Sequence, residues 1–281
     1  MIPTTPATST STTTTTGFSL SPGGLLLPYH VGVIEALTHY EQITPTTPLA
    51  GSSAGSIAVA AHACGVEGSK ILDATSQIAK ECESLGGARG RLLPRLRTAL
   101  NELLTEDEYQ QLVARPGPVA IAYQEVLPRY RSQHQTSFED RDDLVNAICH
   151  SSTFPFFTTN WPVALDTRSS SGGRRIPRLV CDGFFAVPRA RFGCPDFELA
   201  EVKVDRTVMI SVFPQEKIRL EAASTSDCIS PPYKGGSQLE TLFRIATQSS
   251  TTKREYYDVY EAGWKDAEEW VNRENQARLL N

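Results

Sequence analysis

The feature that most constrains this chain is a tight turn between a strand pattern and a helix pattern. The stretch PLAGSSAGSIAVAA, at positions 48–61, enters as a short apolar run, passes through GSSAG at 51–55, and leaves as an alanine-rich helix pattern. A serine between glycines at such a turn can be a nucleophile raised above the edge of a sheet. It can equally be a small residue that lets a helix pack closely on a strand. The five letters alone leave both interpretations open.

Strand and helix patterns alternate over the first 66 residues. A strand pattern at 17–21 is followed by a loop, a helix pattern at 29–41, a short strand at 46–51 and a helix pattern that stops near Gly65. This alternation favours a mostly parallel sheet with helices on both faces. We therefore predict one α/β domain, a three-layer α/β/α fold around a mostly parallel central sheet.

The rest of the chain gives three organisational predictions. Residues 1–16 form an uncharged leader of threonine and serine, 17–215 form the main domain, and 216–281 form a helical extension packed on it. The leader is expected to be disordered, with a plastid-targeting remnant as the minority alternative. The further predicted elements are helices near 69–83, 93–104, 106–115 and 137–152, a strand pair in 116–133, strands in 176–187 and 206–214, and two helices in 236–280.

Composition narrows the class of protein. The formal net charge of −5 argues against nucleic acid as a partner. The six cysteines are scattered without a C-x-x-C pair, which favours reduced thiols in an intracellular protein and no metal site. No window approaches the roughly 18 apolar residues of a spanning helix. The expected location is intracellular, either cytoplasmic or membrane-associated.

The histidines exclude the usual serine triad. An α/β-hydrolase orders its triad as serine, then acid, then histidine. Here the last histidine, His150, precedes Asp182, the acid best placed at a strand end. His30 lies within a predicted helix and is expected to be a packed helical histidine. A serine paired directly with a carboxylate is the arrangement that this order still allows.

Asp182 suits that pairing because it ends the apolar run RLVC and precedes Gly183. Sites in open α/β sheets gather outside the carboxyl ends of strands, where both Ser53 and Asp182 are expected. Apolar surroundings would disfavour the charged carboxylate and raise its basicity. The alternative is an ordinary Asp-Gly turn whose carboxylate caps backbone N–H groups.

A third stretch, SPGGLLLPYH, offers backbone donors. Gly23 and Gly24 follow the first strand and precede a helix, so their N–H groups can point toward an anion. The helix after Ser53 adds its own N-terminal amides, that of Ala54 among them. No lysine follows the glycines and no G-x-G-x-x-G is present, which disfavours nucleotide binding.

Together the glycine loop with its YHVGV helix, GSSAG, and DG without a catalytic histidine resemble the patatin-like lipid acyl hydrolases. The resemblance covers about residues 17–190 and is nearest the branch that contains adipose triglyceride lipase. It implies a Ser53–Asp182 dyad, an oxyanion loop at Gly23 and Gly24, and hydrolysis of fatty acyl esters through an acyl-enzyme. It implies no metal and no organic cofactor.

The glycine loop departs from the common family pattern. Pro22, Leu26 and Leu27 stand where many members have glycine, a basic residue and glycine. The lipase branch similarly tolerates an apolar residue at the basic position, which favours contact with a membrane or a neutral lipid surface. The expected partners are therefore a lipid substrate and a peripheral membrane or lipid-droplet surface.

Several alternatives remain open from the sequence. The chain could be a catalytically weak lipid-binding or storage protein, or a lipid acyltransferase. Phospholipid, galactolipid and acylglycerol all offer the same ester. The leucine face of the helix in 88–104 can pack in the core or contact a membrane, and the arginines of the loop 168–178 can contact head groups. The aromatic stripe of residues 257–271 is expected to pack against the body.

Overall fold

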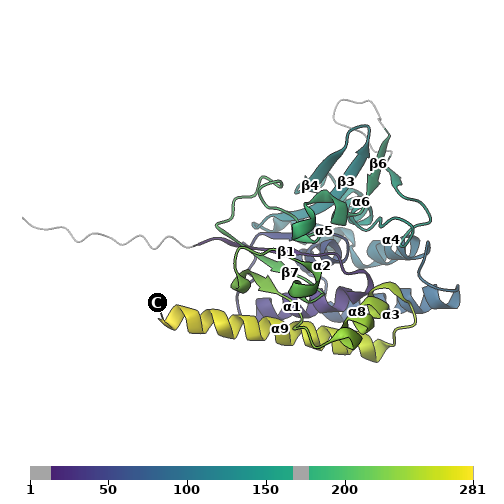
Figure 1. Cartoon of the computed structure of the whole chain (residues 1–281). Helices are drawn as coiled ribbons and strands as arrows, with labels where there is room; N and C mark the ends of the chain where they lie inside the picture. The colour runs from purple at the N-terminus through teal and green to yellow at the C-terminus, as the bar shows by residue number, and fades with distance from the viewer. Residues whose placement is uncertain (1–13, 167–176, 281) are drawn as a thin grey trace, which may run out of the picture.

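A central β-sheet organises the computed structural model, which describes residues 14–166 and 177–280 (Figure 1). Within these residues the sheet has eight strands, and seven of them follow the order β5-β6-β3-β2-β1-β7-β8, with β4 paired to β3 outside this path. The strands are β1 (Thr16–Leu20), β2 (Leu49–Gly51), β3 (Val119–Leu127), β4 (Arg131–Gln135), β5 (Ala164–Asp166), β6 (Arg178–Cys181), β7 (Arg206–Ile210) and β8 (Cys228–Ile229).

The sheet has a parallel part and an antiparallel part. β3, β2, β1, β7 and β8 run parallel to their neighbours. β4, β5 and β6 join through antiparallel pairings. The parallel strands are short and apolar and are buried on both faces, as strands in parallel sheets usually are. The predicted mixed α/β fold with a mostly parallel central sheet is confirmed.

Helices connect the parallel strands. The α-helices are α1 (Leu27–His39), α2 (Ala54–Ala63), α3 (Gly68–Ser84), α4 (Leu92–Leu103), α5 (Glu106–Ala114), α6 (Arg141–Ser151), α7 (Gln215–Ile218), α8 (Gly236–Thr247) and α9 (Lys253–Leu280). Short 3-10 turns are η1 (Gly24–Leu26), η2 (Gly183–Ala186), η3 (Arg189–Arg191) and η4 (Thr225–Asp227). No helix among the described residues is long and apolar enough to cross a membrane.

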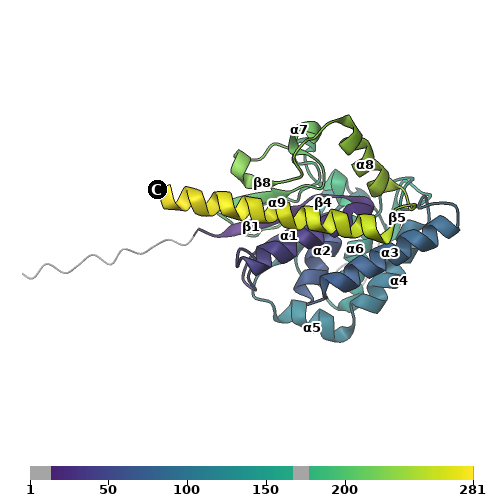
Figure 2. The same ribbon diagram turned by 90° about the horizontal axis from the view of Figure 1, so that it is seen from below.

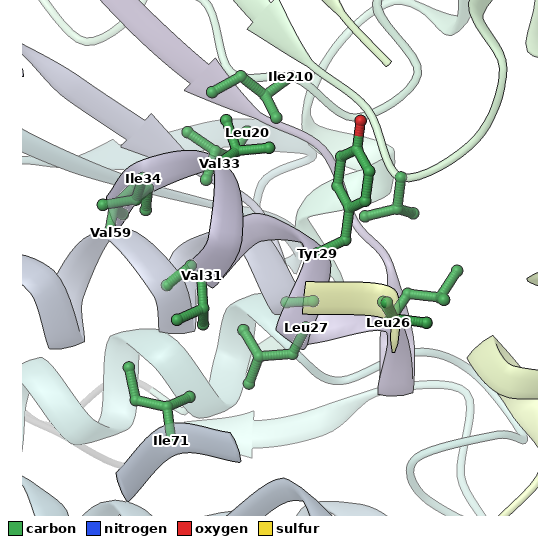
Figure 3. Packing of buried hydrophobic residues seen from close by; sticks show 14 of the residues in the cluster. Leu20, Leu26, Leu27, Tyr29, Val31, Val33, Ile34, Val59, Ile71 and Ile210 are labelled. Carbon is green, nitrogen blue, oxygen red and sulfur yellow. The ribbon is translucent and has the colours of Figure 1, made fainter. Parts of the chain in front are cut away.

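One face of the sheet carries the main hydrophobic core. Alternate strand residues such as Leu20 and Ile210 point to this face, because side chains alternate along a strand. Figure 3 shows them gathered with Val33 of α1, while Ile34 lies against Val59 of α2. The opposite face is covered chiefly by residues 188–205, which pack on small side chains of β2 and β3. This core fixes the carboxyl ends of the strands, where the candidate site lies.

The long helix α9 lies against α1 along one side of the body (Figures 1 and 2). Polar contacts fix the pair: the Tyr29 hydroxyl donates to Asp266 at 2.7 Å, and the Tyr260 hydroxyl donates to Glu35 at 2.5 Å. Trp270 is buried edge-on against Phe18. These contacts seat α9 on α1 and β1.

The buried stripe of α9 differs from the one predicted. The buried residues are Tyr256, Val259, Gly263, Ala267, Trp270 and Val271. The predicted stripe shares only Ala267 and Val271 with this set, because α1 meets α9 on the face that carries Gly263. Tyr260 and Trp264 of the predicted stripe are partly buried and also pack against the core, whereas Tyr257 is 39% exposed.

Other predictions have mixed outcomes. The leucine face of α4 is buried in the core through Leu92, Leu96 and Leu100, so the core interpretation of that helix holds. Strands β5 and β8 were not predicted. β8 belongs to the segment 216–281 and is the edge strand next to β7. The domain boundary itself remains a prediction. Residues 1–13 of the leader and 167–176 of the arginine-containing loop lie outside the described residues.

Candidate active site

The candidate site forms where two strands meet end to end. β2 covers one edge of β3 as far as Ile121, and β6 covers the same edge from Gln124 onward in the opposite direction. This is the same edge because β4 occupies the other edge at both positions. The carboxyl ends of β2 and β6 therefore face each other across two residues of β3. Ser53 follows the first end, and Asp182 follows the second.

Gly183 shows how closely these ends approach. A Cβ atom built on Gly183 would lie 2.8 Å from both Cβ and Oγ of Ser52. It would also overlap the carbonyl oxygen of Ala122 on β3. A side chain at position 183 would force the two ends apart. The close contact between the two strand ends therefore requires glycine at position 183, directly after Asp182.

Ser53 occupies a strained turn. Its φ of 51° and ψ of −120° lie in a region that residues with a side chain rarely adopt. The residue caps the N-terminus of α2 immediately after β2. This is the strand-turn-helix context that the GSSAG pattern needs before it can be interpreted as a nucleophile turn.

The strained turn is anchored by hydrogen bonds through its backbone. The Ser53 amide donates to Oγ of Ser151 at 2.8 Å, and that hydroxyl donates to the carbonyl of Ala122 at 2.6 Å. The Ser53 carbonyl accepts from the Ser56 hydroxyl at 2.6 Å. The Gly55 amide donates to the Ser52 carbonyl at 2.8 Å. The amides on both sides of Ala54, those of Ser53 and Gly55, are therefore occupied.

Ser151 is a residue that sequence reasoning missed. It is fully buried in the last turn of α6, about a hundred positions away from the turn it supports. A serine at the end of a helix pattern carries no local signal of such a role, because helix ends commonly carry serine. The contact could be found only once the fold brings α6 over the end of β3.

Asp182 is buried, and its two carboxylate oxygens differ in their partners. Oδ1 accepts from the Phe184 amide at 2.8 Å. Oδ2 makes no well-formed hydrogen bond with a described residue. The Ser53 hydroxyl is its neighbour, and their interaction acts to lower the Asp182 pKa. Burial outweighs both contacts and raises the pKa of Asp182 to about 7, since an apolar environment disfavours the charged form.

The glycine loop lies beside the start of α2. A Cβ built on Gly23 would lie 3.6 Å from Cβ of Ala54, so the loop and the helix terminus are neighbours. Gly24 has a φ of 55°, in the left-handed region that favours glycine. The ring of His30 holds the start of the loop, because its Nε2 donates to the Ser21 carbonyl at 2.8 Å. Burial lowers the pKa of His30 to about 4, so the ring is neutral, as expected of a packed helical histidine.

An apolar cavity reaches Ser53 from the helix side. It is lined by Gly24, Leu25, Leu27, Ser53, Ala54, Ile57, Thr75, Ile78, Leu92, Leu93, Leu96, Ser152 and Thr158. Its volume of about 50 Å³ is space for one or two groups the size of a water molecule. A larger groove of about 940 Å³ between α3 and residues 249–253 contains none of the candidate residues.

The structure thus brings together five candidate residues at the carboxyl end of the parallel strands: Ser53, Asp182, Gly23, Gly24 and Ala54. Gly51 and Gly55 frame the turn, and Gly183 lies at the contact between the strand ends. No cluster of three or more potential metal ligands occurs in the described part of the chain.

Comparisons with known proteins identify the family of the chain. The sequence model of the family described as "Patatin-like phospholipase" matches residues 18–188. No curated protein matches the chain. Among solved structures, VipD from Legionella pneumophila is 10% identical with a TM-score of 0.46, over 93% of this chain and 67% of that one. ExoU, from the ExoU-SpcU complex of the Pseudomonas aeruginosa type III secretion system, is 15% identical with a TM-score of 0.41, over 92% of this chain and 52% of that one.

These two structural likenesses are distant and carry no argument about the site. The family match is of another kind, because residues 18–188 are more than half of the chain and include the glycine loop, the serine turn and the aspartate. The chain belongs to the patatin-like phospholipase family, a family of lipid hydrolases.

Proposed function

We propose that the protein is a serine lipid acyl hydrolase that cleaves fatty acyl esters with a Ser53–Asp182 dyad. The observation that carries this proposal is the meeting of β2 and β6, which brings a strained serine, itself lining an apolar cavity, beside a buried aspartate. The substrate is an ester of a long acyl chain, as in phospholipids, galactolipids or acylglycerols. The adipose-triglyceride-lipase-like branch remains part of the proposal only on the pattern of the glycine loop, because Leu26 and Leu27 are buried in the core and do not themselves contact a lipid surface.

The dyad needs only one proton carrier. Oγ of Ser53 forms a bond to the ester carbonyl carbon while its proton passes to the free oxygen of Asp182. When the tetrahedral intermediate breaks the ester C–O bond, Asp182 returns that proton to the leaving alcohol. Water then attacks the acyl-enzyme, Asp182 accepts its proton, and that proton goes back to Ser53 as the fatty acid leaves.

Backbone amides hold the negative charge that develops on the carbonyl oxygen. The donors in this proposal are the amides of Gly23, Gly24 and Ala54. The Ser53 amide is not among them, because it already donates to Ser151. Such fixed donors act where charge develops and need no reorganisation during the reaction, and one of them is worth about a hundredfold or more in rate.

Covalent labelling tests the nucleophile without requiring the right head group. A long-chain fluorophosphonate is expected to give one adduct, on Ser53, when the digest is analysed by mass spectrometry. Ser53→Ala should abolish the adduct, and Asp182→Asn should slow its formation. Ser52→Ala is the matched control, since it removes the adjacent hydroxyl and leaves Ser53 intact. An adduct retained in Ser53→Ala, or lost only in Ser52→Ala, would reject this assignment.

Activity is expected to rise with pH through about 7. The proposed base works in its ionised form, and burial raises the pKa of Asp182 to about 7, so the active form is lost as the pH falls below that value. The measurement is kcat/KM on a water-soluble short-chain ester, whose pH dependence reports the free enzyme. A profile that is already level from about pH 5 upward would contradict a desolvated Asp182 as the base.

A further inference from the structure

Seven phenylalanine rings form a continuous chain across the carboxyl end of the sheet. Successive ring centroids lie 4.7–6.5 Å apart, the range of favourable aromatic contacts. We call this chain the phenylalanine belt: Phe154, Phe157, Phe184, Phe185, Phe192, Phe213 and Phe243. Its members come from four separate stretches of sequence and from helix α8.

The belt surrounds the candidate site. The Phe184 amide donates to the carboxylate of Asp182. Phe157 lies at the glycine loop, 3.7 Å from where a Cβ on Gly24 would stand. Phe243 is on α8, whose Ala246 carbonyl would meet the same Cβ. The belt therefore runs from the buried Phe213 of the main core out to partly buried and exposed rings beside the candidate site.

Several aromatic rings in this region are exposed to solvent. Phe243 is 50% exposed and Phe185 is 39% exposed. The turn that joins Phe154 to Phe157 adds Phe156, 53% exposed, and Trp161, 71% exposed. Scattered exposed apolar residues are normal, but a contiguous exposed aromatic patch marks a surface that contacts an apolar partner.

The backbone at Phe156 points in the same direction. Its φ of 57° is in the left-handed region, which is unfavourable for a bulky aromatic residue. Asparagine or glycine would adopt this conformation more easily. An exposed aromatic ring held in a strained conformation stabilises neither the core nor the turn, so its presence needs a partner outside the chain.

The charge beside the part of the belt from Phe154 to Phe192 is positive, whereas the stretches of Phe213 and Phe243 carry Glu216 and Glu240 as well as Lys217 and Arg244. The segments 86–91, 154–161 and 183–192 contain Arg89, Arg91, Arg189 and Arg191 and no acidic residue, in a chain whose net charge is −5. The first segment joins the belt directly, because the Gly90 amide donates to the Phe157 carbonyl at 2.7 Å. Arg191 pairs with Asp196 at 3.6 Å, whereas Arg89 and Arg189 are exposed.

We propose that the phenylalanine belt, with Phe156 and Trp161, docks the protein on the surface of a lipid bilayer that carries anionic head groups. The aromatic rings enter the interface while Arg89 and Arg189 lie at the level of the head groups. The choice of a lipid surface as the partner rests on the proposed function. The docking itself requires no turnover, so the two can be tested apart.

The test uses the full chain with Ser53→Ala, so that no lipid can be consumed during the measurement. Partitioning is measured by flotation with vesicles of four parts phosphatidylcholine to one part phosphatidylserine. Phe156→Asn and Phe243→Asn are each expected to weaken partitioning about tenfold, since each removes a half-exposed phenylalanine from the interface. Omitting phosphatidylserine should weaken binding by a further several-fold, through the loss of attraction to the arginines.

The matched control is Val113→Asn on α5. Val113 is 57% exposed and lies shortly before the amino end of β3, which is the end of the strand opposite to the candidate site. This variant should partition like the parent. Phe156→Asn should also melt no lower than the parent, because asparagine suits the left-handed region, so weaker binding cannot be ascribed to unfolding.

Three results would overturn the inference: no vesicle binding by the parent, unchanged binding in both phenylalanine variants, or an equal loss in Val113→Asn. A parent dimer that both phenylalanine variants convert to monomer, with vesicle binding unchanged, would assign the belt to a second copy of the chain instead. With Ser53 restored, both variants should hydrolyse a soluble ester at the parent rate. If no variant or parent hydrolyses any ester while the binding pattern holds, the proposed function fails and the docking surface stands.

Discussion

Replacing Asp182 with asparagine is expected to lower ester hydrolysis by about a thousandfold or more while making the folded protein more stable above neutral pH. The loss of activity follows because an amide cannot accept the proton of Ser53. The gain in stability follows from burial, which raises the pKa of this carboxyl from an ordinary value of 3.8 to about 7. Few substitutions would separate function from stability as clearly.

The sign of the stability effect depends on pH. Because the folded pKa is the higher one, stability from the protonated carboxyl is fully present below the unfolded value and is lost as pH rises through about 7. At 1.36 kcal/mol per pKa unit, the loss approaches about 4 kcal/mol, an upper bound for the gain that asparagine can give. Urea unfolding at about pH 8 and about pH 4.5 should show the full gain for Asp182→Asn at the first pH and only about a quarter of it at the second, because pH 4.5 is still above the unfolded pKa.

Asp166→Asn provides the contrast. Asp166 is also buried, but its carboxylate pairs with Arg178 at 2.5 Å. Removing this carboxylate leaves Arg178 with only Glu125, at 3.9 Å, as an ion-pair partner in the described residues, and the loss of its nearest partner destabilises by about 1–3 kcal/mol. Asp166→Asn should therefore lose stability above neutral pH and retain hydrolysis by the folded fraction. If Asp182→Asn also lost stability at high pH, the hypothesis that ionising the buried Asp182 destabilises the folded protein would be wrong.

Local patterns were sufficient to place Ser53 and Asp182 at strand ends. A strand, a turn and a helix are each formed by neighbouring residues, so the turns at GSSAG and RLVCDG can be recognised from the sequence. The direction of β6 cannot. It runs antiparallel to β3, and only this direction points Asp182 at the end of β2. The pairing of two ends is a property of the whole sheet, to which the two-residue strand β8 and the three-residue strand β5 belong without clear signals of their own.

The other features of the site depend on contacts between residues far apart in the sequence, so no local sequence pattern predicts them. Ser151 supports the serine turn from the far end of α6. The phenylalanines of the belt come from five separate stretches, and each resembles an ordinary core residue in the sequence, although the fold leaves Phe185 and Phe243 exposed. The expected effect of apolar surroundings on Asp182 is present in the direction predicted, because a carboxyl between buried strands loses solvation wherever its partners come from.

Gly55→Ala is expected to destabilise the protein by about 3 kcal/mol and to abolish labelling of Ser53, although alanine is the better helix former. A Cβ at position 55 would lie 2.6 Å from the Leu20 carbonyl oxygen and 2.8 Å from its carbon. These are backbone atoms of β1, which is hydrogen-bonded to β2 on one edge and to β7 on the other. The strand cannot yield, so the start of α2 must move.

The control is Gly236→Ala in the first turn of α8, where a Cβ would meet nothing within 4 Å. That change should be neutral or stabilise by about 0.5 kcal/mol, as alanine does at an unstrained helical site. Urea unfolding of the two variants compares the same substitution with and without the contact. Equal stability would mean that α2 is not seated on β1. A loss confined to Gly55→Ala would mean that the contact that demands glycine also holds Ser53 at a φ of 51°, because both lie in the first turn of the same helix and cannot move separately.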